Sequence, residues 1–305
     1  MPNPLRLATG ATLAVLRFLV PRLAKGDRSS LGREVMEDRF APASRALAAF
    51  FTTALDAWKN RQYDIEPSGE AALLTRLRQF APTDVLDVGA NEGDWALAAC
   101  RELPATTVHA FEIVEATAGT LDEAVRPFLP RVVVNRFGLG AEARDITMYF
   151  SAASPTTASS LRDVIGIAAA EQGLRDVVEV RGTLRRGDDY LRERGITRVG
   201  LLKIDVEGAE MDVLSGFEAA FAAGAIDLVQ FEYGRGNLTT RIFLADFYRF
   251  FEDRDFTLGK LYPEGVAFKP YDLDDEDFTG PNYVACRRDL VDVIAALTCP
   301  VLRIA

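Results

Sequence analysis

From residue 83 onward, short apolar runs alternate with segments of helical periodicity, and this alternation limits the folds open to the chain. Apolar runs bounded by glycine or polar residues are typical of buried strands. Repeated strand–helix units indicate a parallel sheet covered by helices on both faces. We therefore expect an α/β protein. The predicted strands lie at 83–90, 106–113, 131–138, 145–150, 177–184, 198–205, 227–234, 256–262 and 282–288.

The residues before this region show no strand signal. We expect residues 1–66 to form an N-terminal helical extension and residues 67–305 to form one α/β domain. Apolar residues at 43–60 recur at helical spacing, as in an amphipathic helix. The apolar run Ala11–Val20 is too short to span a bilayer. We favour packing on the domain or formation of a homo-oligomer through these helices; membrane contact by residues 4–24 and an export signal are weaker alternatives.

Composition excludes some partners. The net charge of −10 argues against non-specific binding to nucleic acid, which needs basic surfaces. The three cysteines, Cys100, Cys286 and Cys299, are odd in number and widely spaced, which fits reduced thiols and a cytoplasmic location. The single histidine, His109, lies inside a predicted strand and is interpreted as a packed residue. The polar stretches 151–161 and 271–278 are predicted to be loops.

A glycine turn follows the first predicted strand, in the stretch DVLDVGANEGDWA at 84–96. Gly89 and Gly93 permit a sharp turn and a close approach by a ligand. A dinucleotide fingerprint needs a further glycine at the position of Asn91, so a pyrophosphate site is disfavoured. Glu112 ends the next strand, where an acid can accept hydrogen bonds from ribose hydroxyls.

Four carboxylates follow the apolar strand in LLKIDVEGAEMDVLSG, residues 201–216. Asp205 is expected at the carboxyl end of the strand, the edge at which open α/β sheets bind ligands. Gly208 permits a tight turn into a helix. For Glu210 and Asp212 we favour stabilisation of the helix start, because acids suit the helix dipole there. Glu207 is left undecided between the two roles.

Glu232 ends the neighbouring predicted strand and could face Asp205 across a crevice. One of these two carboxylates could take a proton from a substrate hydroxyl while the other orients the substrate. Alternatively, the two could hold Mg²⁺. Two carboxylates do not establish a metal site, so we do not favour a metal.

The chain resembles the FkbM family of S-adenosylmethionine-dependent methyltransferases. The resemblance rests on DVLDVGANEG, VHAFE, NRFGLG, SSL and, above all, LLKIDVEGAEMDVLSG followed by VQFEY. It covers about residues 80–290 and implies a Rossmann-like class I methyltransferase fold. That fold has a seven-stranded, mostly parallel sheet with an antiparallel hairpin at its end, here expected at 256–262 and 282–288.

The resemblance also implies roles for individual residues. Gly89, Asn91 and Gly93 would line the methionine end of the cofactor, Glu112 the ribose, and Phe137 and Gly138 the adenosine. Ser159 and Ser160 match a serine pair at the rim of the cofactor or acceptor site. The cofactor-binding set is Asp87, Gly89, Ala90, Asn91, Gly93, Glu112, Phe137, Gly138 and Asp205, and the catalytic pair is Asp205 and Glu232.

The expected activity is methyl transfer from S-adenosylmethionine to a hydroxyl of a sugar, glycolipid or secondary metabolite. An NAD-dependent oxidoreductase and a non-catalytic scaffold of the same fold are the alternatives. Segments 140–198 and 233–280 are expected to shape the acceptor pocket. The fold does not encode the acceptor's identity.

Overall fold

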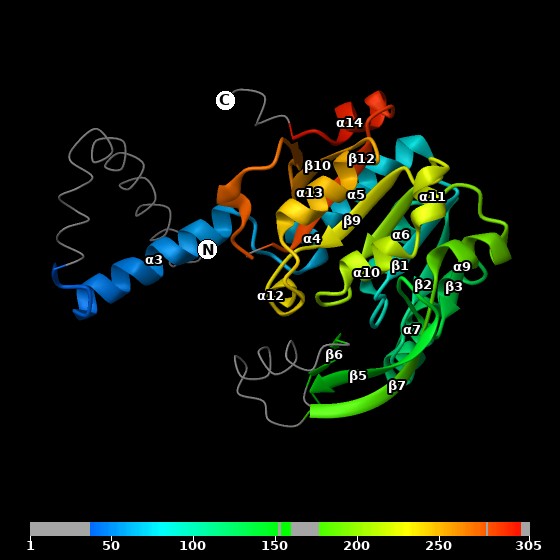
Figure 1. Cartoon of the computed structure of the whole chain (residues 1–305), viewed down its shortest axis with the longest axis horizontal. Coiled ribbons are helices and arrows are strands. Elements are labelled where there is room, and N and C mark those ends of the chain that lie inside the picture. Colours follow the sequence, from blue (N-terminus) through cyan, green and yellow to red (C-terminus); the bar gives the residue numbers. More distant parts are fainter. Residues whose placement is uncertain (1–36, 152–153, 160–176, 279, 300–305) are drawn as a thin grey trace, which may run out of the picture. The chain divides into compact units, whose positions relative to one another are not determined.

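The computed structural model describes residues 37–151, 154–159, 177–278 and 280–299 (Figure 1). The chain divides into two compact units, Met1–Trp58 and Lys59–Ala305. In the first unit, helix α3 spans Pro42–Trp58, which confirms the helix predicted at 43–60. Residues 4–24 lie outside the described residues. In the parts that the structure describes, no helix is long and apolar enough to cross a membrane.

The second unit begins earlier than the boundary expected after residue 66. Asn60 is buried, and its Nδ2 donates hydrogen bonds to the carbonyl oxygens of Ser68 (2.8 Å) and Leu261 (3.0 Å). These bonds tie the segment after Trp58 to the α/β unit.

The second unit contains an eight-stranded sheet in the order β11-β10-β12-β9-β8-β1-β2-β3. The five strands from β9 to β3 run parallel to one another. On the other side of β9, strand β12 runs antiparallel to β9, β10 antiparallel to β12, and β11 antiparallel to β10. The predicted hairpin strands are therefore confirmed as β10 and β12. The strands are β1 (Asp84–Val88), β2 (Thr107–Phe111), β3 (Val132–Asn135), β8 (Leu201–Ile204), β9 (Leu228–Glu232), β10 (Phe256–Tyr262), β11 (Gly265–Phe268) and β12 (Asn282–Arg287).

The sheet has eight strands rather than the expected seven. The additional strand, β11, pairs with β10 through a tight turn in which Tyr262 faces Gly265. Its four residues are too few to show an alternating pattern, so only the pairing with β10 identifies it as a strand.

A smaller four-stranded sheet has the order β4-β7-β5-β6. The prediction of a loop at 151–161 is wrong over residues 154–159, which the structure describes as β6, paired antiparallel with β5. Serine and threonine adopt a strand readily when a neighbouring strand supplies the hydrogen-bond partners. These strands are β4 (Gly138–Leu139), β5 (Arg144–Ser151), β6 (Ser154–Ser159) and β7 (Val177–Arg185).

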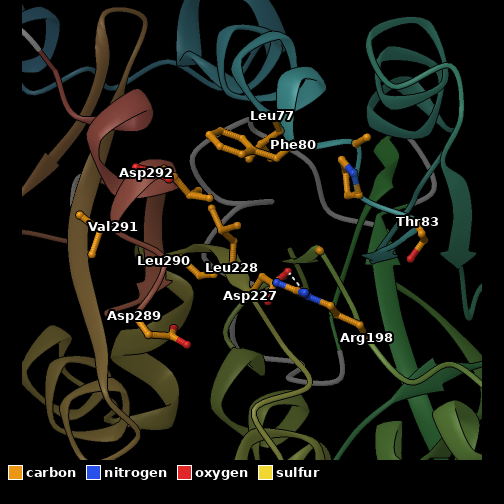
Figure 2. Close-up of a pocket in the computed structure, with 14 residues that line it drawn as sticks. Leu77, Phe80, Thr83, Arg198, Asp227, Leu228, Asp289, Leu290, Val291 and Asp292 are labelled. Carbon is orange, nitrogen blue, oxygen red and sulfur yellow. Dashed lines mark hydrogen bonds and ion pairs between the residues drawn. The ribbon is translucent and has the colours of Figure 1, made fainter.

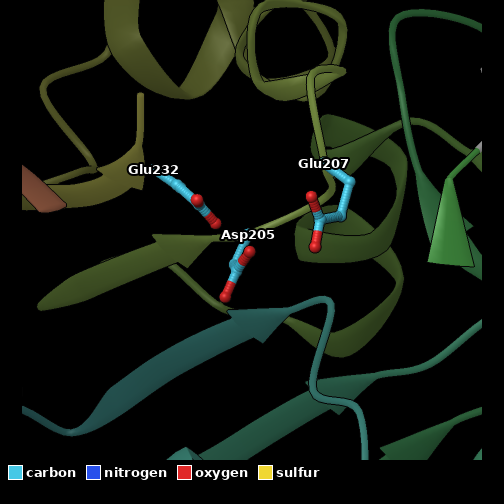
Figure 3. Close-up of side chains that lie close together, drawn as sticks. All are labelled: Asp205, Glu207 and Glu232. Carbon is cyan, nitrogen blue, oxygen red and sulfur yellow. The ribbon is translucent and has the colours of Figure 1, made fainter. Parts of the chain in front are cut away.

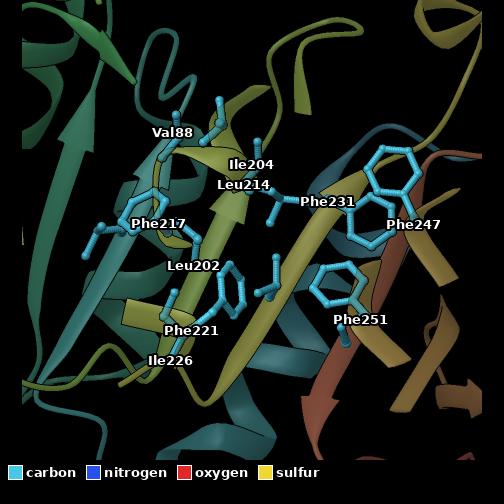
Figure 4. Packing of buried hydrophobic residues seen from close by; sticks show 14 of the residues in the cluster. Val88, Leu202, Ile204, Leu214, Phe217, Phe221, Ile226, Phe231, Phe247 and Phe251 are labelled. Carbon is cyan, nitrogen blue, oxygen red and sulfur yellow. The ribbon is translucent and has the colours of Figure 1, made fainter. Parts of the chain in front are cut away.

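Helices cover both faces of the large sheet, as a parallel sheet requires. One hydrophobic cluster joins α9, α10, α11 and α13 to one face, and Figure 4 shows part of it, including the stacked Phe231 and Phe247. A second cluster joins α5, α6, α7 and α14 to the opposite face. The helices are α4 (Ile65–Ser68), α5 (Glu70–Leu77), α6 (Asp94–Glu102), α7 (Glu115–Val125), α9 (Gly187–Arg194), α10 (Glu210–Ser215), α11 (Glu218–Ala222), α12 (Gly236–Thr240), α13 (Leu244–Glu252) and α14 (Val291–Leu297).

The strand order reverses between β1 and β8. The chain passes from β1 outward to β2 and β3, then returns to place β8 on the other side of β1. Ligands of open α/β sheets bind at such a switch point, beyond the carboxyl ends of the strands. Most of the predicted site residues lie at or directly after strand ends at this edge; Asp87 lies within β1, and Gly138 and Ser159 belong to the smaller sheet.

Candidate active site

The glycine turn after β1 packs directly against the end of β8. Gly89 has φ +81°, and a Cβ on it would lie 1.8 Å from the carbonyl oxygen of Asp205. Gly93, with φ +99°, is the N-cap of α6, and Asn91 also has a positive φ of +50°. Gly89 is therefore required by the contact between two loops, in addition to any approach by a ligand.

Glu112 organises this turn from the end of β2. Its Oε2 accepts a hydrogen bond from the backbone N–H of Asn91 (3.0 Å), and its Oε1 accepts one from the N–H of Val114 (2.7 Å). Burial raises the pKa of Glu112, although the two amide bonds act in the opposite direction. Each carboxylate oxygen retains a second lone pair, so contact with ribose hydroxyls stays a prediction.

A buried ion pair lies beneath the turn. Asp87 and Lys203 are register neighbours on β1 and β8, and their side chains approach to 3.2 Å with exposures of 0% and 6%. Lys203 Nζ also donates to the carbonyl oxygen of Gly89 (3.2 Å) and lies 3.3 Å from Asp205 Oδ2. Asp87 therefore acts on the turn through Lys203, and its direct contact with a cofactor stays a prediction.

Lys203 is a functional residue that the sequence interpretation missed, because it was counted in the apolar run of a buried strand. A single lysine in such a run, two residues before Asp205, was the available signal. Burial by itself lowers the pKa of Lys203, but the charges of Asp87 and Asp205 outweigh this and raise it. The ammonium is therefore permanently charged.

The buried polar side chains Asp87 and Lys203 are followed by a third across the sheet, and the three form a polar row. Gln230 on β9 is the register neighbour of Lys203, and its Nε2 donates to Oε1 of Glu70 on α5 (2.5 Å) and to Oδ1 of Asn282 on β12 (3.2 Å). Burial raises the pKa of Glu70. The Nε2 of Gln230 is thus satisfied by two acceptors, whereas its buried Oε1 has no hydrogen-bond partner among the described residues.

Three carboxylates meet above this row (Figure 3). Asp205 follows β8, Glu207 lies in the next loop, and Glu232 ends β9; one carboxylate oxygen from each lies within 4.8 Å of the other two. The expectation that Asp205 and Glu232 lie together is confirmed. Their catalytic roles stay predictions, and Glu207 joins them at the cluster.

The cluster divides into charged and neutral members. Burial would raise the pKa of Asp205, but the Lys203 ammonium and a hydrogen bond with Glu232 lower it, and the side chain keeps 41% of its surface exposed. Burial and the charge of Asp205 raise the pKa of Glu232 well above its usual value. Burial and the same charge raise the pKa of Glu207 to about 8. These opposite directions favour a proton on Glu232 rather than on Asp205.

The donor set suits a cation. Three carboxylate oxygens could ligate a hard divalent ion, although such an ion needs about six oxygen ligands, more than this cluster supplies. A sulfonium makes no coordination demand and gains from nearby negative charge. The residues present therefore fit S-adenosylmethionine. The glycine turn, Glu112 and the acidic cluster are the groups that would bind it.

The other acids of the stretch 201–216 have different positions. Glu210 is 1% exposed, and its carboxylate accepts hydrogen bonds from the backbone of the preceding loop, so its role extends beyond the helix start that we favoured. Burial raises its pKa to about 7. Asp212 lies 3.6 Å from Arg144 and is 37% exposed, away from the cluster.

The proposed adenosine and rim residues lie in or beside the smaller sheet. The ring of Phe137 packs edge-on against Phe111 and Tyr190 at centroid distances of 5.7 and 6.1 Å. Gly138 begins β4, and a Cβ there would lie 2.8 Å from Leu184. Ser159 ends β6, and Ser160 lies outside the described residues.

His109 is a packed strand residue, as expected. Its Nδ1 and Nε2 lie 2.8 Å from the Tyr190 hydroxyl and 3.1 Å from Asp84 Oδ1. Burial lowers its pKa, although Asp84 opposes the change. Both ring nitrogens are engaged, so the histidine is not available as a general base.

The acidic stretch 271–278 is not merely a solvated loop. Glu276 accepts hydrogen bonds from the hydroxyls of Tyr233 (2.6 Å) and Tyr271 (3.0 Å). It also accepts from the N–H groups of Leu244 (3.1 Å) and Ala245 (2.8 Å) at the start of α13. This one carboxylate ties the stretch to the segment that directly follows Glu232.

A cavity of about 450 Å³ lies at the amino ends of the parallel strands, opposite the acidic cluster (Figure 2). Its lining includes Thr83, Gly200 and Asp227, which directly precede β1, β8 and β9. Arg198 reaches across to Asp227 with an Nε–Oδ2 distance of 2.7 Å. The cavity is therefore separated from the acidic cluster by the length of the parallel strands.

Comparisons with known proteins identify the family of the chain. Residues 87–258 match the family model described as the methyltransferase FkbM domain. The 31-O-demethyl-FK506 methyltransferase FkbM of Streptomyces tacrolimicus is 34% identical over 165 residues, covering 47% of this chain and 62% of that protein. Methyltransferase 1 of Beauveria bassiana is 31% identical over 144 residues, covering 44% and 58%. The chain thus spans less than two thirds of these relatives.

Solved methyltransferase structures are more distant. The O-methyltransferase TomG from Streptomyces achromogenes, in complex with SAM, aligns with a TM-score of 0.40 and 12% identity over 71% of this chain and 78% of that one. A putative O-methyltransferase from Klebsiella pneumoniae aligns with a TM-score of 0.42 and 14% identity over 90% of this chain and 96% of that one. Both TM-scores are low. The assignment to a family therefore rests on the match over residues 87–258 together with the observed strand order. The chain belongs to the FkbM family of S-adenosylmethionine-dependent methyltransferases.

Proposed function

We propose that this protein transfers the methyl group of S-adenosylmethionine to a hydroxyl oxygen of a sugar, glycolipid or secondary metabolite. The observation that carries the proposal is the closeness of Asp205 and Glu232, whose carboxylate oxygens lie within 4.8 Å of each other at the carboxyl ends of β8 and β9. An ionised and a neutral carboxyl side by side can accept a proton and orient a hydroxyl at the same place.

When bound, the cofactor supplies a methyl carbon activated by its sulfonium sulfur. The protein holds the acceptor oxygen in line with that carbon, at roughly 3 Å. Asp205 would accept the proton of the acceptor hydroxyl, whose acidity rises as its oxygen is methylated. The bound cofactor would supply the methyl group and leave as a neutral thioether. Glu232 donates a hydrogen bond to Asp205 and keeps it oriented.

The Lys203 ammonium keeps Asp205 ionised before the reaction. This lowers its basicity, but a weak base is sufficient when proton loss follows C–O bond formation. No step requires a metal, so activity is expected to persist in the presence of EDTA.

The test has two parts. Glycans, lipids and metabolites from cells with and without the gene are compared by mass spectrometry for species that differ by one CH₂ group. Purified protein and S-adenosylmethionine with a deuterated methyl are then added to the extract from the deletion strain, and the label should enter the same species. A titration with NADH in parallel tests the oxidoreductase alternative.

Substitutions then test the assigned residues. Asp205→Asn and Glu232→Gln are expected to reduce turnover by about 10²-fold or more. Asp212→Asn, from the same stretch but outside the cluster, serves as the matched control. Calorimetric titration with S-adenosylmethionine separates loss of binding from loss of chemistry. Full turnover in both of the first two variants would refute the assignment.

A further inference from the structure

Glu210 bridges the two segments that carry the acidic cluster. Its Oε1 accepts hydrogen bonds from the backbone N–H groups of Val206 (3.3 Å) and Gly208 (3.0 Å), which flank Glu207. Its Oε2 accepts a hydrogen bond from Nδ2 of Asn237 (3.3 Å). Glu210 and Asn237 are 1% and 2% exposed, so these bonds are shielded from water.

Asn237 completes the connection on the other side. Its Oδ1 accepts a hydrogen bond from the N–H of Gly234 (3.0 Å), two residues after Glu232. A continuous series of hydrogen bonds therefore runs from the loop after β8, through Glu210 and Asn237, to the segment after β9. Buried networks of this kind hold a defined geometry when every member is satisfied.

The two segments also touch through their backbones. A Cβ on Gly208 would lie 2.8 Å from the carbonyl oxygen of Gly236, and a Cβ on Gly236 would lie 3.0 Å from the nitrogen of Gly208. Between these contacts, Glu207 has a φ of +55°, a conformation that a non-glycine residue keeps only when its surroundings impose it. The hydrogen bonds to Glu210 on either side of Glu207 provide that constraint.

We propose that Glu210 and Asn237 are positioning residues, which hold the segments bearing Asp205, Glu207 and Glu232 at the spacing that recognises the sulfonium of S-adenosylmethionine. The inference rests on the proposed function, because it assigns the cluster to the cofactor's positive charge. Glu210 and Asn237 act through the neighbouring carboxylates and touch neither substrate.

Exchanging the two functional groups gives a matched test. In Glu210→Gln, the new amide nitrogen faces that of Asn237, donor against donor. In Asn237→Asp, two carboxylates face each other. In the double variant, the new amide at position 210 donates to the new carboxylate at position 237, whose other oxygen still accepts from Gly234. The double variant therefore keeps the number of hydrogen bonds and the net charge, with donor and acceptor exchanged between positions 210 and 237.

The measured quantity is the preference for S-adenosylmethionine over S-adenosylhomocysteine, its neutral thioether product, obtained from two calorimetric titrations. Global destabilisation does not alter this ratio in the folded fraction. Asn237→Asp adds a negative charge, so a purely electrostatic effect would strengthen the preference. We expect it to weaken by about three- to tenfold in each single variant and to return to within about twofold of wild type in the double variant. A stronger preference in Asn237→Asp, or no recovery in the double variant, would overturn the inference.

Urea unfolding of the same four proteins tests the connection without a ligand. Each single variant should lower the unfolding midpoint, and the double variant should recover it; additive losses would overturn the inference. If the wild-type protein binds neither nucleoside, the proposed function fails, and the inferred recognition of the sulfonium fails with it. The unfolding cycle then still shows whether Glu210 and Asn237 are partners.

Discussion

Replacing Lys203 with methionine should destabilise the protein strongly, because it leaves a carboxylate buried without its counter-charge. The substitution keeps the length and apolar stem of the side chain and removes the ammonium. Asp87, with a side chain that is 0% exposed, loses the group that lies 3.2 Å away. Asp205 is less affected, because it is 41% exposed and can be hydrated.

Removing one partner of a buried ion pair costs about 3–5 kcal/mol. With a denaturant slope of about 3 kcal/mol per molar urea, typical of the upper range, the unfolding midpoint should fall by about 1–1.7 M. A total stability of about 10 kcal/mol, the middle of the usual range, would leave the variant folded but weakened. Adding Asp87→Asn removes the stranded charge and should recover much of the loss.

Urea unfolding followed by circular dichroism measures these shifts, and Lys260→Met is the matched control. Lys260 is also buried, but it lies over the Tyr283 ring, and burial lowers its pKa to about 8. Its loss leaves no buried carboxylate unpaired, although it removes a hydrogen bond to the Gly280 carbonyl oxygen (3.4 Å), so it should cost much less than the loss of Lys203. Equal midpoints for the two methionine variants, or no recovery on adding Asp87→Asn, would refute the reasoning.

The loss of stability in the Lys203→Met variant should also depend on pH. Burial already raises the pKa of Asp87 in the wild-type protein, with the Lys203 ammonium acting in the opposite direction. In the Lys203→Met variant, the folded-state pKa of Asp87 rises further above the unfolded value of about 3.9. A group with a raised pKa contributes stability that is present below the unfolded pKa and lost as pH rises. The variant should therefore approach wild type near pH 4 and fall behind above it. A loss of stability that does not change with pH would contradict the inference that Asp87 is left as an uncompensated carboxylate.

Three further outcomes follow from the site. Gly89→Ala should abolish binding of S-adenosylmethionine and destabilise the fold by more than about 2 kcal/mol, since its Cβ would meet the Asp205 carbonyl; calorimetry and urea unfolding measure both. Glu112→Gln places a donor opposite a backbone N–H and should weaken cofactor binding about tenfold, whereas unchanged affinity would remove Glu112 from the site. Glu207→Gln should raise the urea midpoint relative to wild type, increasingly as pH rises from its usual pKa of 4.5 toward about 8, because the fold favours the neutral form; parallel pH profiles would contradict this.

The architecture was largely predictable because it depends on local patterns. The strand–helix alternation indicated the parallel sheet, and strand ends placed Asp205 and Glu232 at one edge. β11 and β6 were not predictable, because a short or hydroxyl-rich segment becomes a strand only through its partner.

The supporting residues of the site were also missed, for a related reason. Lys203 has the position of an apolar strand residue, and its role appears only when the β1–β8 register places Asp87 beside it. Glu210 has the sequence position of a helix-start acid. Its bond to Asn237 joins residues from two different strand–helix connections, and no local pattern encodes that pairing.

The anchoring of Glu276 has a consequence for attempts to change the acceptor by loop grafting. The stretch 271–278 looks like an exchangeable surface insert, yet Glu276 receives hydrogen bonds from Tyr233 and from the start of α13. A transplanted loop without that carboxylate would leave the Tyr233 hydroxyl and two helix N–H groups without this acceptor, next to Glu232. Grafts in this family member should therefore retain Glu276, or include α13 and the end of β9 as a single cassette.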